Sequence, residues 1–549
     1  MTAETTGLAS GEASHTGLDR RDLLKAGVFA GAAVTLPTLR AVGAAAPAKL
    51  AASKLPQPFT VPFVRPPDAV PVAQDATTDY YVIDEIAAQA EVIPGYRSWV
   101  YSYNGTVPGA VIHAQRNRPT VVRFRNKLPA THPTLGYESW TSVHLHGSNS
   151  LPQYDGYAGD VTRPGEYKDY HYSNEETGRF IWYHDHGMHH TAENAYHGLA
   201  GMYVVHDPAE EKAIPLPQGE FDVPLMVGEA AFQPDGNLWF SIDNQNMFPS
   251  DVILVNGRPW PVMKVKRRKY RFRLVVATVS RSFGFKLSNG MPFQVIASDG
   301  GLLPQPEPTF VLRQCAGERY EIVIDFAEVF KGVAAGARVN LMNAPTATVN
   351  VDNPNTDKVM AFEVTDEPFD TANNSVPPVL RSFDAPLTWR TEEVAASRLW
   401  LLHRSGGLWK INNTTWDDVV NSEYEQVGAT IPIGSIEMWT WKNSGGGWFH
   451  PSHAHWIDAK VISRNGRPPL PYERGVKDTL FLGQNEEIKV LVKLDAPGTW
   501  MIHCHNLIHE DHDMMTQFQV VDGAGGRGDH PINAARPRSL AFEESDPIS

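Results

Sequence analysis

The sequence predicts an all-β protein built from three Greek-key β-sandwich domains. Its 549 residues, 42% of them hydrophobic, can bury a large core and correspond to about three domains of roughly 150 residues each. Glycine (44) and proline (42) are abundant, which favours short strands joined by turns over long helices. Apolar residues concentrate in strand-length segments such as 120–126 (TVVRFRN) and 319–326 (RYEIVIDF).

The first 46 residues are predicted to be an export signal rather than part of the fold. The twin arginines Arg20 and Arg21 precede a modestly apolar run at 26–36, and 44–46 offers an A-x-A cleavage site. The apolar run is too short to serve as a permanent membrane anchor, so we expect no integral membrane segment. We therefore expect the twin-arginine (Tat) machinery to export the precursor, leaving a periplasmic or extracellular (secreted) protein.

Composition and strand-like segments divide the rest of the chain. The predicted parts are a linker or ordered arm at 47–78, a first sandwich at 79–208, a second at 215–364, a connector at 365–395, a third sandwich at 396–522 and a flexible tail at 523–549. The second sandwich carries no metal-ligand motif. We interpret it as a spacer that holds its neighbours in place.

Net charge and cysteine content narrow the function. A net charge of −14 makes nucleic acid an unexpected partner. The only two cysteines are Cys315 and Cys504, and we interpret Cys315 as a small buried hydrophobe. If Cys504 binds a metal ion, no disulfide can form within the chain.

The stretch 501–515 (MIHCHNLIHEDHDMM) carries the densest set of metal-ligand residue types. On a β-strand, His503 and His505 project to one side and Cys504 to the other, so one strand can serve two sites. His509 and Met514 follow five and ten residues after Cys504. Thiolate, imidazole and thioether form a soft donor set, typical of a blue-copper electron-transfer site rather than of structural zinc, calcium or magnesium.

Three further His-x-His pairs occur, at His144 and His146, at His184 and His186, and at His453 and His455. With His503 and His505 they make eight imidazoles, more than one metal ion can use, since a mononuclear site takes about four to six ligands. A cluster of several ions is therefore predicted. Its ligands come only from the first and third sandwiches, so we expect it at their interface. His450 stands apart from its pair and can supply a second imidazole to the Cys504 site.

The chain resembles the multicopper oxidases, whose segments HxHG, HxH, HPxHxH and HCHxxxHxxxxM are present here in that order. It is most similar to the bilirubin oxidase and bacterial laccase-like branch, over roughly residues 80 to 522. The resemblance implies cupredoxin-like domains and four copper ions. It implies a type 1 copper at His450, Cys504, His509 and axial Met514, a type 2 copper at His144 and His453, and two type 3 coppers at His146, His184, His186, His455, His503 and His505.

Two acidic residues match positions at which the family handles protons. These are Asp155, eleven residues after His144, and Glu510, directly after His509. Reduction of O2 consumes protons, so an acid near the cluster is needed. The alternative is that these carboxylates orient ligand histidines, and one carboxylate can do both. Trp448, two residues before His450, is a candidate substrate contact, with core packing as its alternative.

The leading functional prediction is an oxidase that couples four one-electron oxidations of phenols, aminophenols or tetrapyrroles such as bilirubin to reduction of O2 to water. One alternative is a cuprous or other metal-ion oxidase for copper detoxification, although the 13 methionines form no Met-rich insertion. Another is a non-enzymatic periplasmic scaffold. Ser452 and Ala454 stand where relatives commonly carry bulkier aliphatics, which makes bilirubin an insecure substrate.

Overall fold

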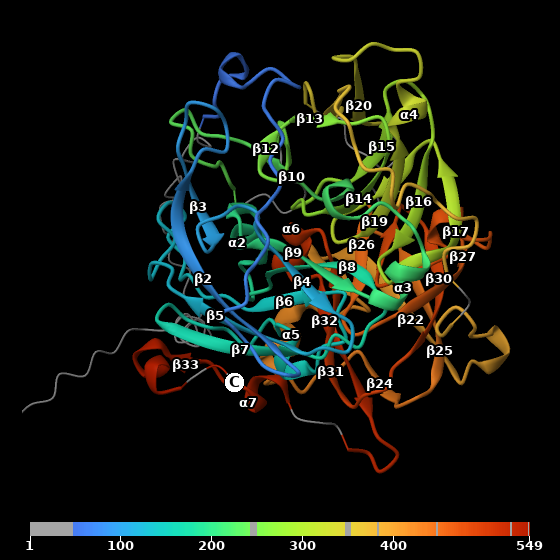
Figure 1. Cartoon of the computed structure of the whole chain (residues 1–549). Coiled ribbons are helices and arrows are strands. Elements are labelled where there is room, and N and C mark those ends of the chain that lie inside the picture. Colours follow the sequence, from blue (N-terminus) through green and yellow to red (C-terminus); the bar gives the residue numbers. More distant parts are fainter. Residues whose placement is uncertain are drawn as a thin grey trace, which may run out of the picture. The chain divides into compact units, whose positions relative to one another are not determined.

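The computed structural model describes residues 48–241, 250–345, 353–381, 384–445, 448–526, 530–546 and 548, and the predicted export signal lies outside them. The described strands form six sheets, which pair into three β-sandwiches in chain order, coloured blue to cyan, green to yellow and orange to red in Figure 1. The prediction of an all-β fold with three sandwiches is confirmed. The exact domain limits stay predictions.

The first sandwich pairs a six-stranded with a four-stranded sheet. The six-stranded sheet has the order β1 (Ala73–Gln74), β2 (Asp79–Ala90), β5 (Thr120–Asn126), β7 (Glu166–Tyr172) and β33 (Arg538–Ser539), with β3 (Ser98–Tyr103) also on β2. The four-stranded sheet has the order β4 (Gly109–Gln115), β9 (Ala200–His206), β8 (Arg179–Asp185) and β6 (Val143–His146). Alternate residues of both sheets, such as Ile83, Phe124 and Tyr203, form the core between them.

The second sandwich is the largest apolar core. Its seven-stranded sheet has the order β12 (Arg258–Pro259), β11 (Val252–Val255), β10 (Asp222–Ala230), β14 (Lys269–Val276), β19 (Arg319–Asp325), β16 (Phe293–Ser298) and β17 (Gly301–Thr309). The facing sheet has the order β13 (Val262–Val265), β21 (Lys358–Val364), β20 (Arg338–Asn343), β15 (Phe283–Leu287) and β18 (Leu312–Gln314). Phenylalanine and branched aliphatic side chains fill the space between the two sheets.

The third sandwich is rich in buried tryptophan. Its six-stranded sheet has the order β23 (Leu408–Ile411), β22 (Ala396–Ser405), β25 (Ile436–Asn443), β30 (Glu487–Lys493), β27 (Ala459–Arg464) and β28 (Val476–Lys477). The facing sheet has the order β24 (Ala429–Pro432), β32 (Met515–Val521), β31 (Gly498–Cys504), β26 (His450–Ala454) and β29 (Thr479–Leu482). Trp400, Trp439, Trp441 and Trp500 lie in the core between these sheets together with Cys504.

Each of the six sheets contains one parallel pair among its otherwise antiparallel described strands. In the first sandwich these pairs are β2 with β5 and β4 with β9. The later sandwiches repeat the arrangement with β10 and β14, β13 and β21, β22 and β25, and β24 and β32. Parallel neighbours require a crossover connection, as the predicted Greek-key topology does.

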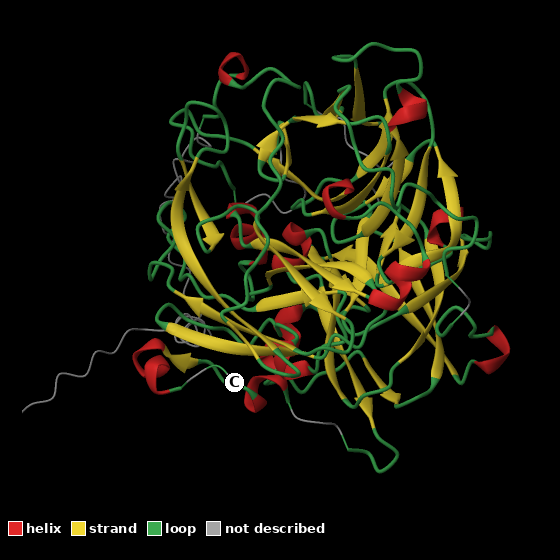
Figure 2. Cartoon of the chain, in the orientation of Figure 1, coloured by secondary structure: helices red, strands yellow, loops and turns green. Residues whose placement is uncertain are grey.

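Helices are short and lie in the connections between strands, some of them in the middle of the molecule, as Figure 2 shows. The described α-helices are α2 (Thr191–His197), α3 (Pro208–Ala213), α4 (Phe326–Val329), α5 (Trp416–Asn421), α6 (Leu507–Asp511) and α7 (Pro531–Ala534). The 3-10 helices are η1 (Ala52–Lys54), η2 (Pro152–Tyr154), η3 (Gly219–Phe221), η4 (Thr391–Glu393), η5 (Pro471–Glu473) and η6 (Leu540–Ser545). Within the described ranges, none of these helices has the length and apolar character needed to span a bilayer.

The two ends of the described chain lie against the sandwiches. In the arm, Pro62 bridges to Val262 and Asp68 to Val111, so the segment before β1 follows the second sandwich and then the first. At the C-terminus, β33 pairs with β7, and the Arg123 guanidinium donates to the carbonyl of Asp546. This differs from the flexible tail that we predicted. Pairing with β7 satisfies backbone groups at the edge of that sheet, which favours an ordered end.

Candidate metal centre

Strand register places the predicted ligands opposite one another. In the third sandwich β26 pairs with β31, so that His453 faces His503 and Ser452 faces Cys504 across the ladder. In the first sandwich β6 pairs with β8, and His144 faces His184. Because side chains alternate along each strand, one face of these strands carries imidazoles in pairs. Strand pairing thus brings the four motifs together as two sets of histidines, one in the first sandwich and one in the third.

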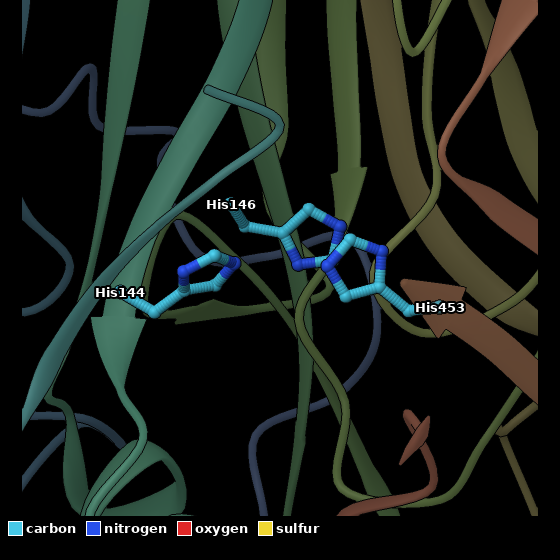
Figure 3. A group of neighbouring side chains, drawn as sticks. All are labelled: His144, His146 and His453. Atoms are coloured by element: carbon cyan, nitrogen blue, oxygen red, sulfur yellow. The ribbon is translucent and has the colours of Figure 1, made fainter. Parts of the chain in front are cut away.

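All eight paired histidines are buried and come together between the first and third sandwiches, as predicted. Each of the eight has at most 1% of its surface exposed. Their nitrogen atoms group into sets that could hold metal ions, and one set joins His144 and His146 of β6 with His453 of β26. Figure 3 shows these three rings turned toward one another from the two sandwiches. Closure of this interface and assembly of the cluster are therefore linked.

Two further sets have three histidines each, His146 with His184 and His505, and His186 with His455 and His503. In the second of these triads, His503 Nε2 lies 3.3 Å from His186 Nε2 and 3.2 Å from His455 Nε2. Three ring nitrogens converging in this way leave room for one ion bound by all three. Each triad draws on both sandwiches, so neither sandwich alone could complete it.

Backbone carbonyls hold three of the rings through Nδ1. His144 Nδ1 donates to the carbonyl of Asp155 (2.6 Å), His453 Nδ1 to that of Asp478 (3.0 Å) and His184 Nδ1 to that of Asp185 (2.8 Å). Their Nε2 atoms are buried and have no hydrogen-bond partner in the described part of the chain. A ring that donates a hydrogen bond from one nitrogen and has no hydrogen-bond partner at the other is typical of a metal-ligating histidine.

Burial also keeps three of the predicted ligand rings in the form that binds metal. Burial lowers the pKa of His450 to about 3, and the same cause lowers the pKa of His186 and of His505 to about 3. The rings are therefore neutral at pH 7 and present lone pairs. Neutral imidazoles whose lone pairs face one another form a donor set that a late transition metal fits.

A separate group surrounds Cys504 on the opposite side of β31. His450 Nδ1 lies 3.3 Å from Cys504 Sγ, His509 Nδ1 lies 3.6 Å from it, and the two Nδ1 atoms are 3.3 Å apart. All three side chains are fully buried. Met514 is buried in the same core as Cys504, and its backbone carbonyl accepts from the Cys504 amide at 3.0 Å. The structure thus gathers one thiol, two imidazoles and a neighbouring thioether.

Both predicted carboxylates contact ligand histidines. Asp155 Oδ2 lies 2.7 Å from His455 Nδ1, and Glu510 Oε2 lies 2.9 Å from His503 Nδ1. Burial raises the pKa of Asp155 to about 6. At Glu510 the effect of burial is outweighed by the interactions with the His503 and His186 rings, which include a hydrogen bond from His503, and the pKa falls to about 2. Glu510 therefore stays ionised well below neutral pH, whereas Asp155 takes up a proton just below it, although both lie beside the cluster.

Trp448 and the two unusual positions in the third ligand motif lie close to the Cys504 group. Trp448 is half-buried, and its ring centroid is 6.1 Å from that of His509 in an edge-to-face arrangement. Ser452 and Ala454 are fully buried, Ala454 within the apolar core of the third sandwich. Small side chains there leave that core to be filled by its tryptophans. Whether Trp448 contacts substrate stays a prediction.

Two residues beside the Cys504 group were missed by sequence reasoning. Trp409 stacks on His509, with ring centroids 3.9 Å apart. Asn506 caps α6, its side chain accepting from the His509 amide, and so positions the turn that carries this ligand. The Asn before a short helix was a readable signal for the cap, whereas nothing in the sequence ties Trp409 to His509.

The second sandwich supports the cluster without supplying a histidine. Gly317 packs so closely that a Cβ there would lie 2.8 Å from His505 Cδ2, and its φ of +84° also favours glycine. Arg319 donates to Asp478 Oδ1 at 2.7 Å, and this carboxylate lies 3.3 Å from His146 Nε2. The spacer that we predicted therefore also forms one wall of the site.

Comparison with known proteins agrees with this geometry. Two family models described as multicopper oxidase match residues 86–210 and 401–524. A bilirubin oxidase from Albifimbria verrucaria is 42% identical over 486 residues, which cover 84% of this chain and 81% of that protein. A laccase from Bacillus subtilis (strain 168) is 32% identical over 515 residues, which cover 83% of this chain and 97% of the laccase.

Solved structures agree as well. The McoA multicopper oxidase from Aquifex aeolicus aligns with a TM-score of 0.71 at 26% identity, over 83% of this chain and 100% of that one. A multi-copper oxidase from Pediococcus acidilactici aligns with a TM-score of 0.75 at 24% identity, over 87% of this chain and 94% of that one, and supports the fold alone.

The cupredoxin-like fold and the buried nitrogen and sulfur groups define a copper-dependent oxidoreductase that uses O2. The chain belongs to the multicopper oxidase family. The family resemblance drawn from the four histidine motifs is thereby confirmed, and the scaffold alternative is not supported, since all twelve predicted ligands lie in the clusters or directly beside them.

Proposed function

We propose that this chain couples four one-electron oxidations of a phenolic, aminophenolic or tetrapyrrole reductant to the reduction of O2 to two waters. Copper, when bound, would accept the electrons one at a time and deliver four of them to O2. The single observation that carries this proposal is the pair of donor sets on β31. Cys504 faces His450 and His509, while His503 and His505 enter the two histidine triads.

The proposed copper assignment follows the groups of donor atoms. His450, Cys504, His509 and Met514 would hold a type 1 copper, and His144 and His453, whose Nε2 atoms are orphaned, a type 2 copper. The two triads would hold the type 3 pair, which brings the proposed total to four. Cys504 is bonded through the backbone to both His503 and His505, so a short covalent path joins the two regions.

Asp155 and Glu510 are proposed to manage the four protons that the reaction consumes. Asp155 contacts His455 and Glu510 contacts His503. Only one imidazole ring therefore separates each carboxylate from the site where O2 would be reduced. Because burial raises the pKa of Asp155 to about 6, this carboxyl can both hold and release a proton near neutral pH. The same contacts fix the ring planes of the two histidines.

The reductant is proposed to reach the protein near Trp448, whose ring lies edge-to-face with that of His509. Export by the twin-arginine pathway to a periplasmic or extracellular location is proposed from residues 1–46. The related bilirubin oxidase and laccase support organic reductants.

Oxygen uptake by copper-loaded protein tests the proposal. Bilirubin, 2-aminophenol, a dimethoxyphenol and Cu(I) are supplied in parallel. The amount of reductant oxidised and the amount of O2 consumed are measured in the same reaction. We expect four electrons per O2 with at least one organic reductant. Turnover of Cu(I) that far exceeds every organic reductant would favour a metal-ion oxidase. Bleaching of a reductant without O2 consumption would contradict the proposal.

A further inference from the structure

Four side chains outside the buried clusters form a line of contacts on the first sandwich. Asp68 comes from the arm, His113 from β4, His206 from the end of β9 and Glu211 from α3. His113 Nε2 lies 3.1 Å from Asp68 Oδ1, His113 Nδ1 lies 2.8 Å from His206 Nε2, and His206 Nδ1 lies 2.6 Å from Glu211 Oε1. The order is therefore carboxylate, imidazole, imidazole, carboxylate.

Counting protons shows that this line lacks one. Each of the three contacts needs a hydrogen, because ionised carboxylates only accept and a ring nitrogen without hydrogen only accepts. Two neutral imidazoles carry two ring hydrogens between them. If both hydrogens point outward to Asp68 and Glu211, the two inner nitrogens of His113 and His206 present lone pairs to each other. In that arrangement, either an added proton or a metal cation must occupy the contact.

The surroundings leave room for a cation at this contact. The group opens on a pocket of about 440 Å³, whose other lining residues include Asp222 and Arg273. Arg273 is already engaged with Asp222 (2.6 Å) and Glu321 (2.8 Å), so its charge is compensated.

The outer carboxylates complete a known pattern of metal sites. A histidine that binds a metal through one ring nitrogen usually donates the other N–H to a carboxylate, which fixes its tautomer and raises its basicity. Here both histidines have such a partner. The same pattern occurs in the buried cluster, where His455 contacts Asp155. The surface pair differs in being partly open, with 36% of the His113 side chain and 30% of the His206 side chain exposed.

We propose that His113 Nδ1 and His206 Nε2 bind one zinc ion, as a site separate from the family's coppers. Imidazole suits zinc, and water would fill the remaining positions. Bonds of about 2.0 to 2.1 Å place two tetrahedral ligands about 3.3 Å apart, so the pair must open by about half an ångström. Bound metal would tie the arm, β4, β9 and α3 together.

Zinc binding to copper-loaded protein tests this site, because the buried clusters are then already filled. Equilibrium dialysis against micromolar zinc, with zinc and copper per chain measured by mass spectrometry, should give one zinc beyond the copper. His113→Gln and His206→Gln should each weaken zinc binding by at least about tenfold, and Glu211→Gln by about tenfold through loss of orientation. His171→Gln, at an exposed histidine on β7, is the matched control and should bind as the unchanged protein does.

The readouts separate the outcomes. We expect the copper content and the visible spectrum to be the same in all four variants. Bound zinc should raise the melting temperature of the unchanged protein and of His171→Gln, and should not raise that of His113→Gln. If the unchanged protein takes up no zinc, or if His113→Gln and Glu211→Gln both bind it undiminished, the contact holds a proton and the metal site does not exist.

Discussion

Trp409 stacks on the imidazole of His509, with ring centroids 3.9 Å apart and planes inclined by 29°. Trp409 lies on β23 and is 1% exposed, and the Arg404 guanidinium carbon lies 4.9 Å from the centroid of its ring. One face of a proposed copper ligand is thus covered by an indole, which is itself covered by a cation. This stack keeps water from the ring and fixes its plane.

Replacing Trp409 should therefore change the properties of the Cys504 group more than its copper content. Trp409→Leu opens the face of His509 to water, which favours the oxidised ion, so we expect a lower reduction potential and a shifted visible band. Trp409→Phe keeps a ring and should change both less. Trp416→Phe, at a buried tryptophan of α5, is the control. Redox titration showing equal potentials in all of them would refute a tuning role.

Asp155 offers a way to separate proton transfer from ligand orientation. Asp155→Asn keeps an oxygen that can accept from His455 Nδ1 but cannot carry a proton, so kcat for O2 reduction should fall by about 10²-fold or more with copper content unchanged. Asp155→Ala should lose copper as well. A kcat that stays unchanged in Asp155→Asn would assign the residue to orientation alone.

The pair of Arg319 and Asp478 should matter for stability. Both side chains are almost fully buried, and Asp478 also contacts His146. Arg319→Met leaves Asp478 charged without this partner, so we expect unfolding to become easier by about 3–5 kcal/mol. Lys331→Met breaks an exposed pair with Glu328 and should cost under about 1 kcal/mol. Denaturant unfolding of copper-loaded protein measures both, and similar losses would contradict this account.

Glu85 predicts a pH dependence of stability that is independent of the copper clusters. Burial raises the pKa of this carboxyl from an ordinary 4.5 to about 8, and Thr141 Oγ1 donates to it at 2.6 Å. Between these two values the folded state holds a proton that the unfolded state has lost. The free energy of unfolding therefore decreases as pH rises through this window, by the contribution of Glu85.

Glu85→Gln should remove that contribution. The variant gains stability relative to the unchanged protein as the pH is raised from about 5 to about 8, with little difference at the acidic end. Thr141→Val removes the hydroxyl that favours the charged form, so the folded-state pKa of Glu85 should rise further and the loss of stability should continue to higher pH. Thermal unfolding from about pH 5 to about pH 9 tests both variants. A difference between Glu85→Gln and the unchanged protein that is constant with pH would show that the carboxyl titrates normally.

The predictable part of the fold and site was local in sequence. The spacing of His503, Cys504 and His505 determines which side of a strand each side chain takes, so the two donor sets on one strand follow from the alternation of side chains alone. The abundance of glycine and proline, which form turns between short strands, likewise indicated the β-sandwich class. Both inferences rest on neighbours within a few residues, where backbone periodicity acts directly.

The missed part depended on contacts between distant segments. Trp409 lies a hundred residues before His509, and no period links them. Arg319 reaches Asp478 from another sandwich, and the ordered C-terminus depends on β33 meeting β7. These contacts form only when the three sandwiches pack together. Patterns among residues that are close in sequence therefore do not predict them.

Copper content and the visible spectrum of unchanged protein and Cys504→Ser, recorded under full copper loading, test the central claim most directly. The account predicts about four copper ions per chain and an intense visible band for the unchanged protein. Cys504→Ser should lose that band and its oxidase activity while keeping the copper held by the eight histidines. Fewer than four coppers in the unchanged protein, or a band that persists without the Cys504 sulfur, would contradict it.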